Sequence, residues 1–276
     1  MLTGAPLLIC DSNLSHAWAR AFTLVMEGSK TSRCPLLLSI DGFRDNLPQE
    51  DLSIRQELDR SLALHGKYSS AVSGSVIFPF NQWERAGRPP SSRLFPWYLN
   101  EFLPRLKARD ALNRNGTYFE RMIAFQGAKR VGAKTEISTK NQLEQIIFQW
   151  RRDQKKRRRP RQSALQVSCF DPPKDHTGQS MRGFPCLQQV GFAYDDMGGL
   201  SITALYPTQY IFDRAYGNYL GLCHLGSFMA HELGAQLVRL NVLVSYPELG
   251  SPAKSALKRL KNLVQDLVDA GTIQHP

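Results

Sequence analysis

The sequence lacks any long hydrophobic run. No stretch approaches the roughly 20 apolar residues that cross a bilayer, although 42% of the 276 residues are apolar. The first residues, Met-Leu-Thr-Gly-Ala-Pro, have no basic segment of the kind that opens a secretory signal. Gly-rich phosphate loops and Gly-x-Ser-x-Gly are also missing. We therefore expect a cytoplasmic protein that makes no use of a membrane and is neither a P-loop enzyme nor an α/β-hydrolase.

Cysteine is scarce and unpatterned. The five cysteines, at positions 10, 34, 169, 186 and 223, form an odd set without Cys-x-x-Cys. That usage suits a reducing compartment rather than a disulfide framework. His224 and His231 lie seven residues apart, yet no set of cysteines, histidines and carboxylates completes the spacing of a zinc site. We expect no bound metal.

Positive charge is abundant and locally concentrated. The net charge is +11, and residues 151–161 alone carry eight basic residues and one acidic residue. A run of this sign attracts phosphate groups, either of a nucleotide or of nucleic acid. It is equally typical of a solvated helix end, where basic side chains favour the negative end of the helix dipole.

The hydrophobic pattern predicts one α/β domain of the α+β type over residues 1–276. Strands are expected at 6–10, 35–40, 165–170, in the run that contains Cys186, at 200–206 and at 237–246. Helices are expected from 14 to Gly28, over 51–65, over 95–106 with a break at a proline, over 141–156, over 217–233 and from Ser251 onward. Residues 118–123 fit a strand or a helix, and residues 126–138, rich in Gly, Lys, Ser and Thr, suggest a loop. The segment 217–233 is apolar nearly all round, which predicts a long buried central helix.

Cys186 follows Phe184-Pro185 at the entrance to this β-rich region. A thiol in that position can be held rigidly at the edge of a strand and face a pocket as a nucleophile. A lone cysteine more often packs inside a protein as a small apolar side chain. Both interpretations stay open at this level.

The order of these segments resembles thymidylate synthase and its relative deoxycytidylate hydroxymethylase. The residues that carry the resemblance are Asn115–Met122, Asn141–Ile146, Pro185-Cys186, Leu205-Tyr206, Gly217-Asn218 and Val244–Tyr246. No single motif is specific, but the ordered set is. The resemblance covers a core at 113–250, with a divergent part at 1–112 and a C-terminal helix at 251–276, and it implies a thymidylate synthase-like fold with a mixed sheet.

The resemblance also implies a chemistry. In the family a cysteine thiolate adds to C6 of a pyrimidine nucleotide, and C5 then takes a one-carbon unit, methyl or hydroxymethyl, from 5,10-methylenetetrahydrofolate. Cys186 matches that nucleophile, Asn218 the residue that binds the pyrimidine edge, and Tyr246 the residue that contacts the sugar. Arg121 is a candidate for the substrate phosphate. Subunits of the family pair through a sheet, so we expect a homodimer. Arg159 and Arg161 are candidates for arginines donated by the partner subunit.

Several positions depart from the family. Leu187 stands where a histidine follows the catalytic cysteine. The segment Tyr206–Tyr210, which contains the further candidate Gln209, replaces one that carries an arginine and an aspartate. Glu84 and Glu120 are the candidates for the glutamate that organises proton transfer. Two hypotheses therefore remain: a divergent methyl- or hydroxymethyltransferase acting through Cys186, or a catalytically degenerate module on the same fold that binds nucleotide, binds nucleic acid through residues 151–161, or serves as an assembly subunit.

Overall fold

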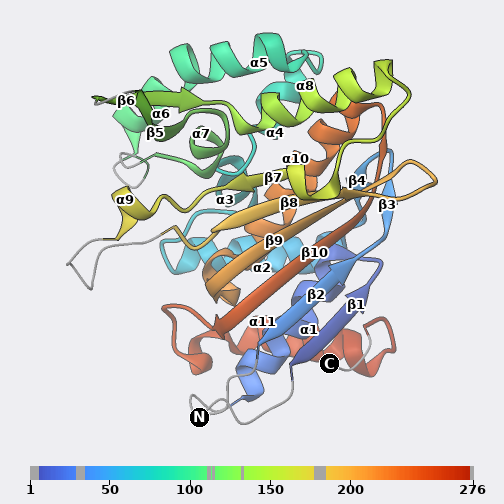
Figure 1. Cartoon of the computed structure of the whole chain (residues 1–276). Coiled ribbons are helices and arrows are strands. Elements are labelled where there is room, and N and C mark those ends of the chain that lie inside the picture. The colour runs from blue at the N-terminus through green and yellow to red at the C-terminus, as the bar shows by residue number, and fades with distance from the viewer. Residues whose placement is uncertain are drawn as a thin grey trace.

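The computed structural model describes residues 6–28, 35–110, 113, 116–131, 134–176 and 185–273. At its centre is a six-stranded mixed sheet with the strand order β1-β2-β10-β9-β8-β7. The pairs β1–β2 and β9–β10 are parallel, and the other neighbouring pairs are antiparallel. In Figure 1 this sheet lies in front of a layer of helices that includes α10, α1 and α2. The predicted mixed sheet with flanking helices is confirmed.

The strands of the main sheet are β1 (Leu7–Asp11), β2 (Leu36–Ile40), β7 (Gln166–Ser168), β8 (Gln189–Tyr194), β9 (Gly199–Tyr210) and β10 (Gln236–Glu248). Two separate hairpins are formed by β3 (Phe43–Arg44) with β4 (Leu47–Pro48) and by β5 (Phe125–Val131) with β6 (Lys134–Lys140). The helices in chain order are α1 (Leu14–Glu27), α2 (Leu52–Leu64), α3 (Ser70–Ser75), α4 (Phe80–Arg85), α5 (Ser91–Trp97), the π-helical η1 (Tyr98–Phe102) and α6 (Leu103–Arg109). After these come α7 (Tyr118–Ile123), α8 (Gln142–Lys155), the 3-10 turn η3 (Gln162–Ala164), α9 (Pro172–Asp175), the π-helical η4 (Ile211–Ala215), α10 (Tyr216–Leu233), the 3-10 turn η5 (Lys254–Leu257) and α11 (Lys258–Asp269).

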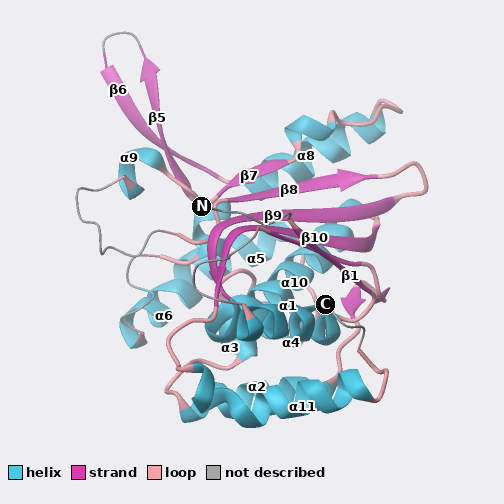
Figure 2. Cartoon of the chain, turned by 90° about the horizontal axis from the view of Figure 1, so that it is seen from below, coloured by secondary structure: helices cyan, strands magenta, loops and turns pink. Residues whose placement is uncertain are grey.

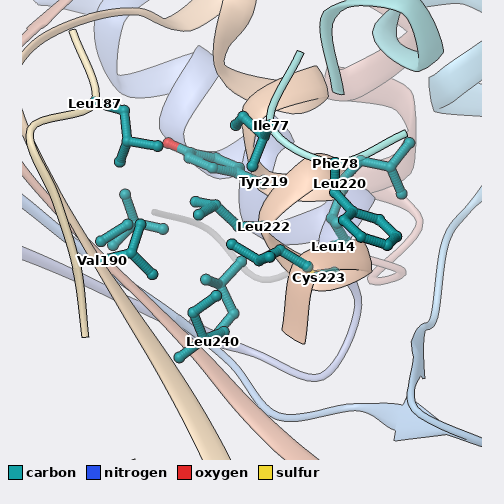
Figure 3. Close-up of a cluster of buried hydrophobic side chains, with 14 of the residues drawn as sticks. Leu14, Ile77, Phe78, Leu187, Val190, Tyr219, Leu220, Leu222, Cys223 and Leu240 are labelled. Carbon is teal, nitrogen blue, oxygen red and sulfur yellow. The ribbon is translucent and has the colours of Figure 1, made fainter. Parts of the chain in front are cut away.

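The helix α10 is the buried central helix that the sequence predicts. Nearly every residue from Tyr216 to Leu233 is buried, and Gly234 ends the helix with a φ of 64°, a left-handed conformation that glycine adopts without strain. Figure 3 shows Leu220, Leu222 and Cys223 of this helix among buried side chains of the sheet, such as Val190 and Leu240, and of the loop after α3, Ile77 and Phe78. The core therefore lies between α10 and the sheet.

The helices α3 and α10 approach each other closely because glycines meet at their crossing. A Cβ atom built on Gly221 would lie 2.6 Å from the carbonyl oxygen and 2.9 Å from the Cα of Gly74. A Cβ on Gly217 would lie 2.5 Å from the Cβ of Ser73 and 2.7 Å from the carbonyl oxygen of Ser70. Only glycine fits at 217 and 221 at this separation, so these positions fix how α3 packs on the central helix.

Sequence patterning located the N-terminal helices well. Asn13 caps α1 by accepting hydrogen bonds from the amides of Ser15 and His16, and Asp51 caps α2 through the amide of Ser53. In α8 the predicted inward residues Leu143, Ile146, Ile147 and Trp150 are all buried. The break predicted within 95–106 is the π-helical turn η1, which follows Pro96 in α5 and precedes Pro104 in α6.

Other predictions were wrong. Residues 126–138 are not a loop but most of the β5–β6 hairpin, which projects from the body of the protein (Figure 2). Its strands pair mainly with each other, so they lack the apolar alternation that marks a strand against a core. The last α-helix begins at Lys258 rather than at Ser251, because the Ser251 hydroxyl and amide bind Asp213 instead of capping a helix. Residues 118–123, left open by the sequence, form α7.

The strand placed at Cys186 was also wrong. β8 begins at Gln189, three residues later, and Cys186 lies in the segment that leads into it. The preceding residues 177–184 lie outside the described residues, as does Cys34. Among the helices that the structure describes, none combines the length and apolar character needed to cross a membrane.

One face of the main sheet has no described helix in front of it (Figure 1). Four leucines form a row across this face, because Leu8 pairs with Leu37, Leu37 with Leu243, and Leu243 with Leu205. The exposed fractions of Leu8, Leu37 and Leu243 are 66%, 41% and 37%. These leucines form an exposed apolar row on the uncovered face of the sheet.

Candidate functional site

The candidate site lies where β9 ends and α10 begins. The strand β9 leads through η4 directly into α10, so Gln209, Arg214, Asn218 and Tyr219 come from one short stretch of chain. The segment of Cys186 arrives beside the same end of β9, since the amide of Gln188 donates to the carbonyl of Leu205. The sheet topology thus brings the predicted nucleophile to the end of β9 that leads into the central helix.

Tyr118 of α7 holds the Cys186 segment in place. Its hydroxyl accepts hydrogen bonds from the backbone amides of Cys186, at 3.1 Å, and of Leu187, at 3.3 Å. Burial raises the pKa of Tyr118, so the group stays a neutral phenol. Cys186 is partly buried, whereas Leu187 is fully buried and lies near the hydroxyl end of Tyr219 (Figure 3). No sequence pattern indicates this role, although Tyr118 belongs to the segment 115–122 that supports the resemblance.

Further buried polar groups surround this segment. The hydroxyl of Tyr219 donates to Oε1 of Gln209 at 2.8 Å, and Gln209 is 1% exposed. Tyr206 is 0% exposed, and its hydroxyl lies within electrostatic reach of Tyr118, Tyr219 and Cys186. Within the described part of the chain, neither the hydroxyl of Tyr206 nor Nε2 of Gln209 has a hydrogen-bond partner. Buried polar groups are nearly always satisfied, so two such groups together require an explanation.

Arg214 supplies positive charge to the thiol. Burial raises the pKa of the Cys186 thiol, and the Arg214 guanidinium opposes that increase. The Arg214 side chain is exposed, with its guanidinium carbon 5.8 Å from the ring centre of Tyr68. The sequence analysis missed Arg214. The available signal was a basic residue within Ile211–Ala215, whose other members are all buried.

Arg121, predicted to bind a substrate phosphate, is engaged in a buried ion pair. Its guanidinium donates to both carboxylate oxygens of Asp175, at 2.6 and 2.8 Å, and to the carbonyl of Cys169 at 2.8 Å. Burial opposes ionisation of Asp175, but the bonds from Arg121 and from the Asp171 amide lower its pKa. The cavity of about 40 Å³ beside Arg121 has room for about one water molecule. The local geometry therefore gives Arg121 a structural role within one chain.

Arg159 and Arg161 lie at the other end of β8 from Cys186. Arg159 binds Asp196, and its guanidinium carbon lies 5.6 Å from the ring centre of Tyr194, the last residue of β8. At about 3.3 Å per residue along a strand, Tyr194 is roughly 17 Å from Gln189, the residue at the end of β8 that faces Cys186. Neither arginine serves the thiol of its own chain, so any role in substrate binding requires a second subunit.

The basic run of which they are part is only partly neutralised. Arg151 binds the buried carboxylate of Glu232, and Arg152 binds Asp153. The side chains of Lys155, Lys156, Arg157, Arg158 and Arg161 are exposed. Binding of nucleic acid by this run stays a prediction from its charge.

Asn218 and Tyr246 lie at the same end of the sheet as Cys186. Asn218 is the third residue of α10 and 5% exposed, so it is part of the helix rather than its cap. Tyr246 pairs with Thr208 in the β9–β10 ladder and is 37% exposed. The fold thus brings Cys186, Gln209, Asn218 and Tyr246 to one end of the β9–β10 pair.

The remaining acidic candidates have other partners. Glu84 of α4 pairs with Arg88, which lies three residues beyond the end of that helix, and Glu120 accepts a bond from Lys107 at 2.8 Å. Asp213, next to Arg214, binds Lys67 at 3.0 Å and the Ser251 hydroxyl at 2.8 Å. Within the described residues, no group of histidines, cysteines and carboxylates is arranged to hold a metal ion.

Comparison of the sequence with models of known protein families gives no match, and comparison with curated proteins gives none either. The fold and the site therefore define the chain as a mixed-sheet α+β protein with a tyrosine-held cysteine at the end of its sheet.

Proposed function

We propose that this chain is a divergent thymidylate synthase-like protein whose Cys186 adds covalently to C6 of a pyrimidine nucleotide, with transfer of a one-carbon unit to C5. The observation that carries the proposal is the placement of Cys186. Its backbone is fixed by Tyr118, an arginine lies within electrostatic reach, and the end of β9 that lies beside it leads into the helix carrying Asn218. A fixed backbone and a nearby guanidinium suit a cysteine nucleophile, while burial leaves the pKa of the Cys186 thiol raised overall.

Each group has a defined task in this scheme. The thiolate of Cys186 forms a bond to C6, the C5–C6 double bond opens, and the electron pair moves towards C5 and the C4 carbonyl oxygen. Arg214 favours the thiolate and offers two parallel donors to an anionic substrate group. The Asn218 amide presents both a donor and an acceptor, which suits a uracil edge. Tyr246 is the candidate for contact with the sugar.

The fit to a folate is not supported by the described residues. The family uses an aspartate to orient the pterin, and Asp213, the buried carboxylate beside this site, is bound by Lys67 and Ser251. Methylenetetrahydrofolate would supply the one-carbon unit, and its use by this chain is a prediction from the resemblance alone. The addition of Cys186 to the pyrimidine does not depend on it.

The test is formation of a covalent adduct. We expect 5-fluorodeoxyuridylate alone to add to the wild-type protein and to raise the intact mass by one nucleotide. If the chain uses methylenetetrahydrofolate, its presence should add the mass of the folate as well. Peptide mapping should place the label on Cys186. The Cys186→Ala variant should gain no mass, whereas Cys10→Ala, which removes an exposed cysteine on β1, should label like the wild type.

Failure to label with any pyrimidine nucleotide would reject the enzymatic proposal. The alternative would then be a catalytically degenerate module on this fold that binds a nucleotide or nucleic acid or acts in assembly. A label that persists in Cys186→Ala would reject the assignment of the nucleophile while leaving the reaction in place.

We also propose that the chain forms a homodimer through the uncovered face of the sheet. The leucine row 8–37–243–205 is self-complementary across a two-fold axis, and polar residues flank it. The hydroxyl of Ser39 donates to Asn241, and Asn241 donates to Thr203 in the neighbouring row. An apolar row beside a satisfied polar row is the composition expected of an interface.

Leu243→Glu should convert that dimer into a monomer, because two carboxylates would be buried at the centre of the interface. Multi-angle light scattering measures the change in mass. Leu64→Glu is the matched control, since Leu64 is 75% exposed at the end of α2, away from this face. A dimer that survives Leu243→Glu at micromolar concentration would refute the sheet face as the interface.

A further inference from the structure

Two buried groups without a partner among the described residues, the Tyr206 hydroxyl and Nε2 of Gln209, are both hydrogen-bond donors. Tyr219, which binds Gln209, has its hydroxyl end near Leu187, the residue after Cys186 (Figure 3). Oε1 of Gln209 already accepts from Tyr219, so the free end of its side chain is the Nε2 amide group. Tyr206 retains its phenolic proton because burial raises its pKa. The pair therefore offers donors to a group that brings only acceptors.

We propose that Tyr206 and Gln209 form a donor pair that binds a carbonyl oxygen of the molecule attacked by Cys186 and stabilises the negative charge which develops there. This inference rests on the proposed function and adds the substrate class, a planar ring with a carbonyl conjugated to the attacked carbon. When sulfur adds to such a system, the electron pair of the carbon–carbon double bond moves onto the carbonyl oxygen as an enolate. Preorganised donors aimed at that oxygen are the strongest electrostatic device available to an enzyme.

The surroundings fit this role better than a structural one. A buried hydroxyl that serves only the fold should have a partner, because leaving it without one destabilises the folded state. Tyr219 fixes the amide of Gln209 from the side of α10, while Tyr118 fixes the backbone of Cys186 from α7. Gln209 and the backbone of Cys186 are thus held by tyrosines from two different helices.

Tyr206→Phe separates the two interpretations. Removing an unpartnered hydroxyl should leave the melting temperature unchanged or raise it, so the variant should fold. A second variant, Gln209→Leu with Tyr219→Phe, removes the other donor without leaving the Tyr219 hydroxyl unpartnered. Tyr210→Phe is the matched control, since Tyr210 is 42% exposed one residue beyond Gln209.

The probes are acrylamide and methyl methanethiosulfonate, with the rate at Cys186 followed by peptide mass. Acrylamide reacts by conjugate addition: the sulfur bonds to the β-carbon, the double bond opens to an enolate, and a proton from solvent ends on the α-carbon. Methyl methanethiosulfonate forms a disulfide with release of methanesulfinate, and no carbonyl takes part. The measured quantity is the rate with acrylamide divided by the rate with methyl methanethiosulfonate. This ratio cancels any change in the ionisation of the thiol or in access to it.

We expect this ratio to fall about tenfold in both variants, a modest share of the loss seen when a dedicated oxyanion donor is removed. The ratio at Cys186 in Tyr210→Phe, and the ratio at Cys10 in every variant, should stay constant. A ratio at Cys186 that changes by less than about twofold in both variants overturns the donor pair. That result is independent of whether 5-fluorodeoxyuridylate forms an adduct, so the inference and the proposed function fail separately.

Discussion

Arg121→Met is expected to destabilise the protein by about 3–5 kcal/mol, because it leaves the buried carboxylate of Asp175 without its partner. Asp175 is 8% exposed, and it receives both guanidinium bonds of Arg121. The same substitution removes the donor to the carbonyl of Cys169. Urea-induced unfolding followed by circular dichroism measures the loss.

The double variant Arg121→Met/Asp175→Leu provides the control. It removes both charges and should recover most of the lost stability, since a buried ion pair is often replaceable by apolar side chains of similar size. If Arg121 instead served a substrate phosphate, the single variant would unfold at nearly the wild-type urea concentration. That outcome would contradict the structural role.

The pH dependence of the free energy of unfolding should also reflect the Arg121–Asp175 ion pair. The pKa of Asp175 is lower in the folded protein than the usual value for an aspartate. Its contribution to stability is therefore present above that usual value and is lost as the pH falls through the folded pKa. We expect the difference in stability between the wild type and the double variant to be constant near neutral pH. In acid the wild type should lose stability relative to the double variant.

Gly221→Ala is expected to cost about 2–3 kcal/mol, although alanine favours a helix over glycine by about 1 kcal/mol. The added Cβ would lie 2.6 Å from the carbonyl oxygen of Gly74, and backbone atoms cannot rotate away. The helix α3 must therefore move off α10, which opens the packing around Ile77. Thermal unfolding in a calorimeter gives the change in melting temperature.

Gly226→Ala is the matched control on the same helix. Its added Cβ would meet the terminal methyl groups of Leu237, at 2.8 and 2.9 Å, which can adopt another rotamer. We expect its stability to lie within about 1 kcal/mol of the wild type, because helix propensity offsets the local crowding. Equal losses at 221 and 226 would show that burial, rather than the glycine contact between helices, sets the cost.

The sequence by itself determined the elements that bury an apolar face. A helix such as α8 carries inward residues at helical spacing, and α10 is apolar all round, so each could be located from local pattern alone. The caps Asn13 and Asp51 bind amides within their own turns, so these contacts too depend on local sequence. The β5–β6 hairpin could not be predicted in this way, because each strand pairs with the other and the sequence has little apolar alternation there.

Only the tertiary structure decided which candidate residues share a site. The sequence does not show which of Arg121 and Arg214 lies near Cys186. In the structure Arg121 is paired with Asp175, whereas Arg214 lies within electrostatic reach of Cys186. Tyr118 reaches the Cys186 segment across 68 residues of chain, and no local pattern records such a contact. Side-chain chemistry could suggest Cys186 as a candidate nucleophile, but only long-range packing determines which residues lie near it.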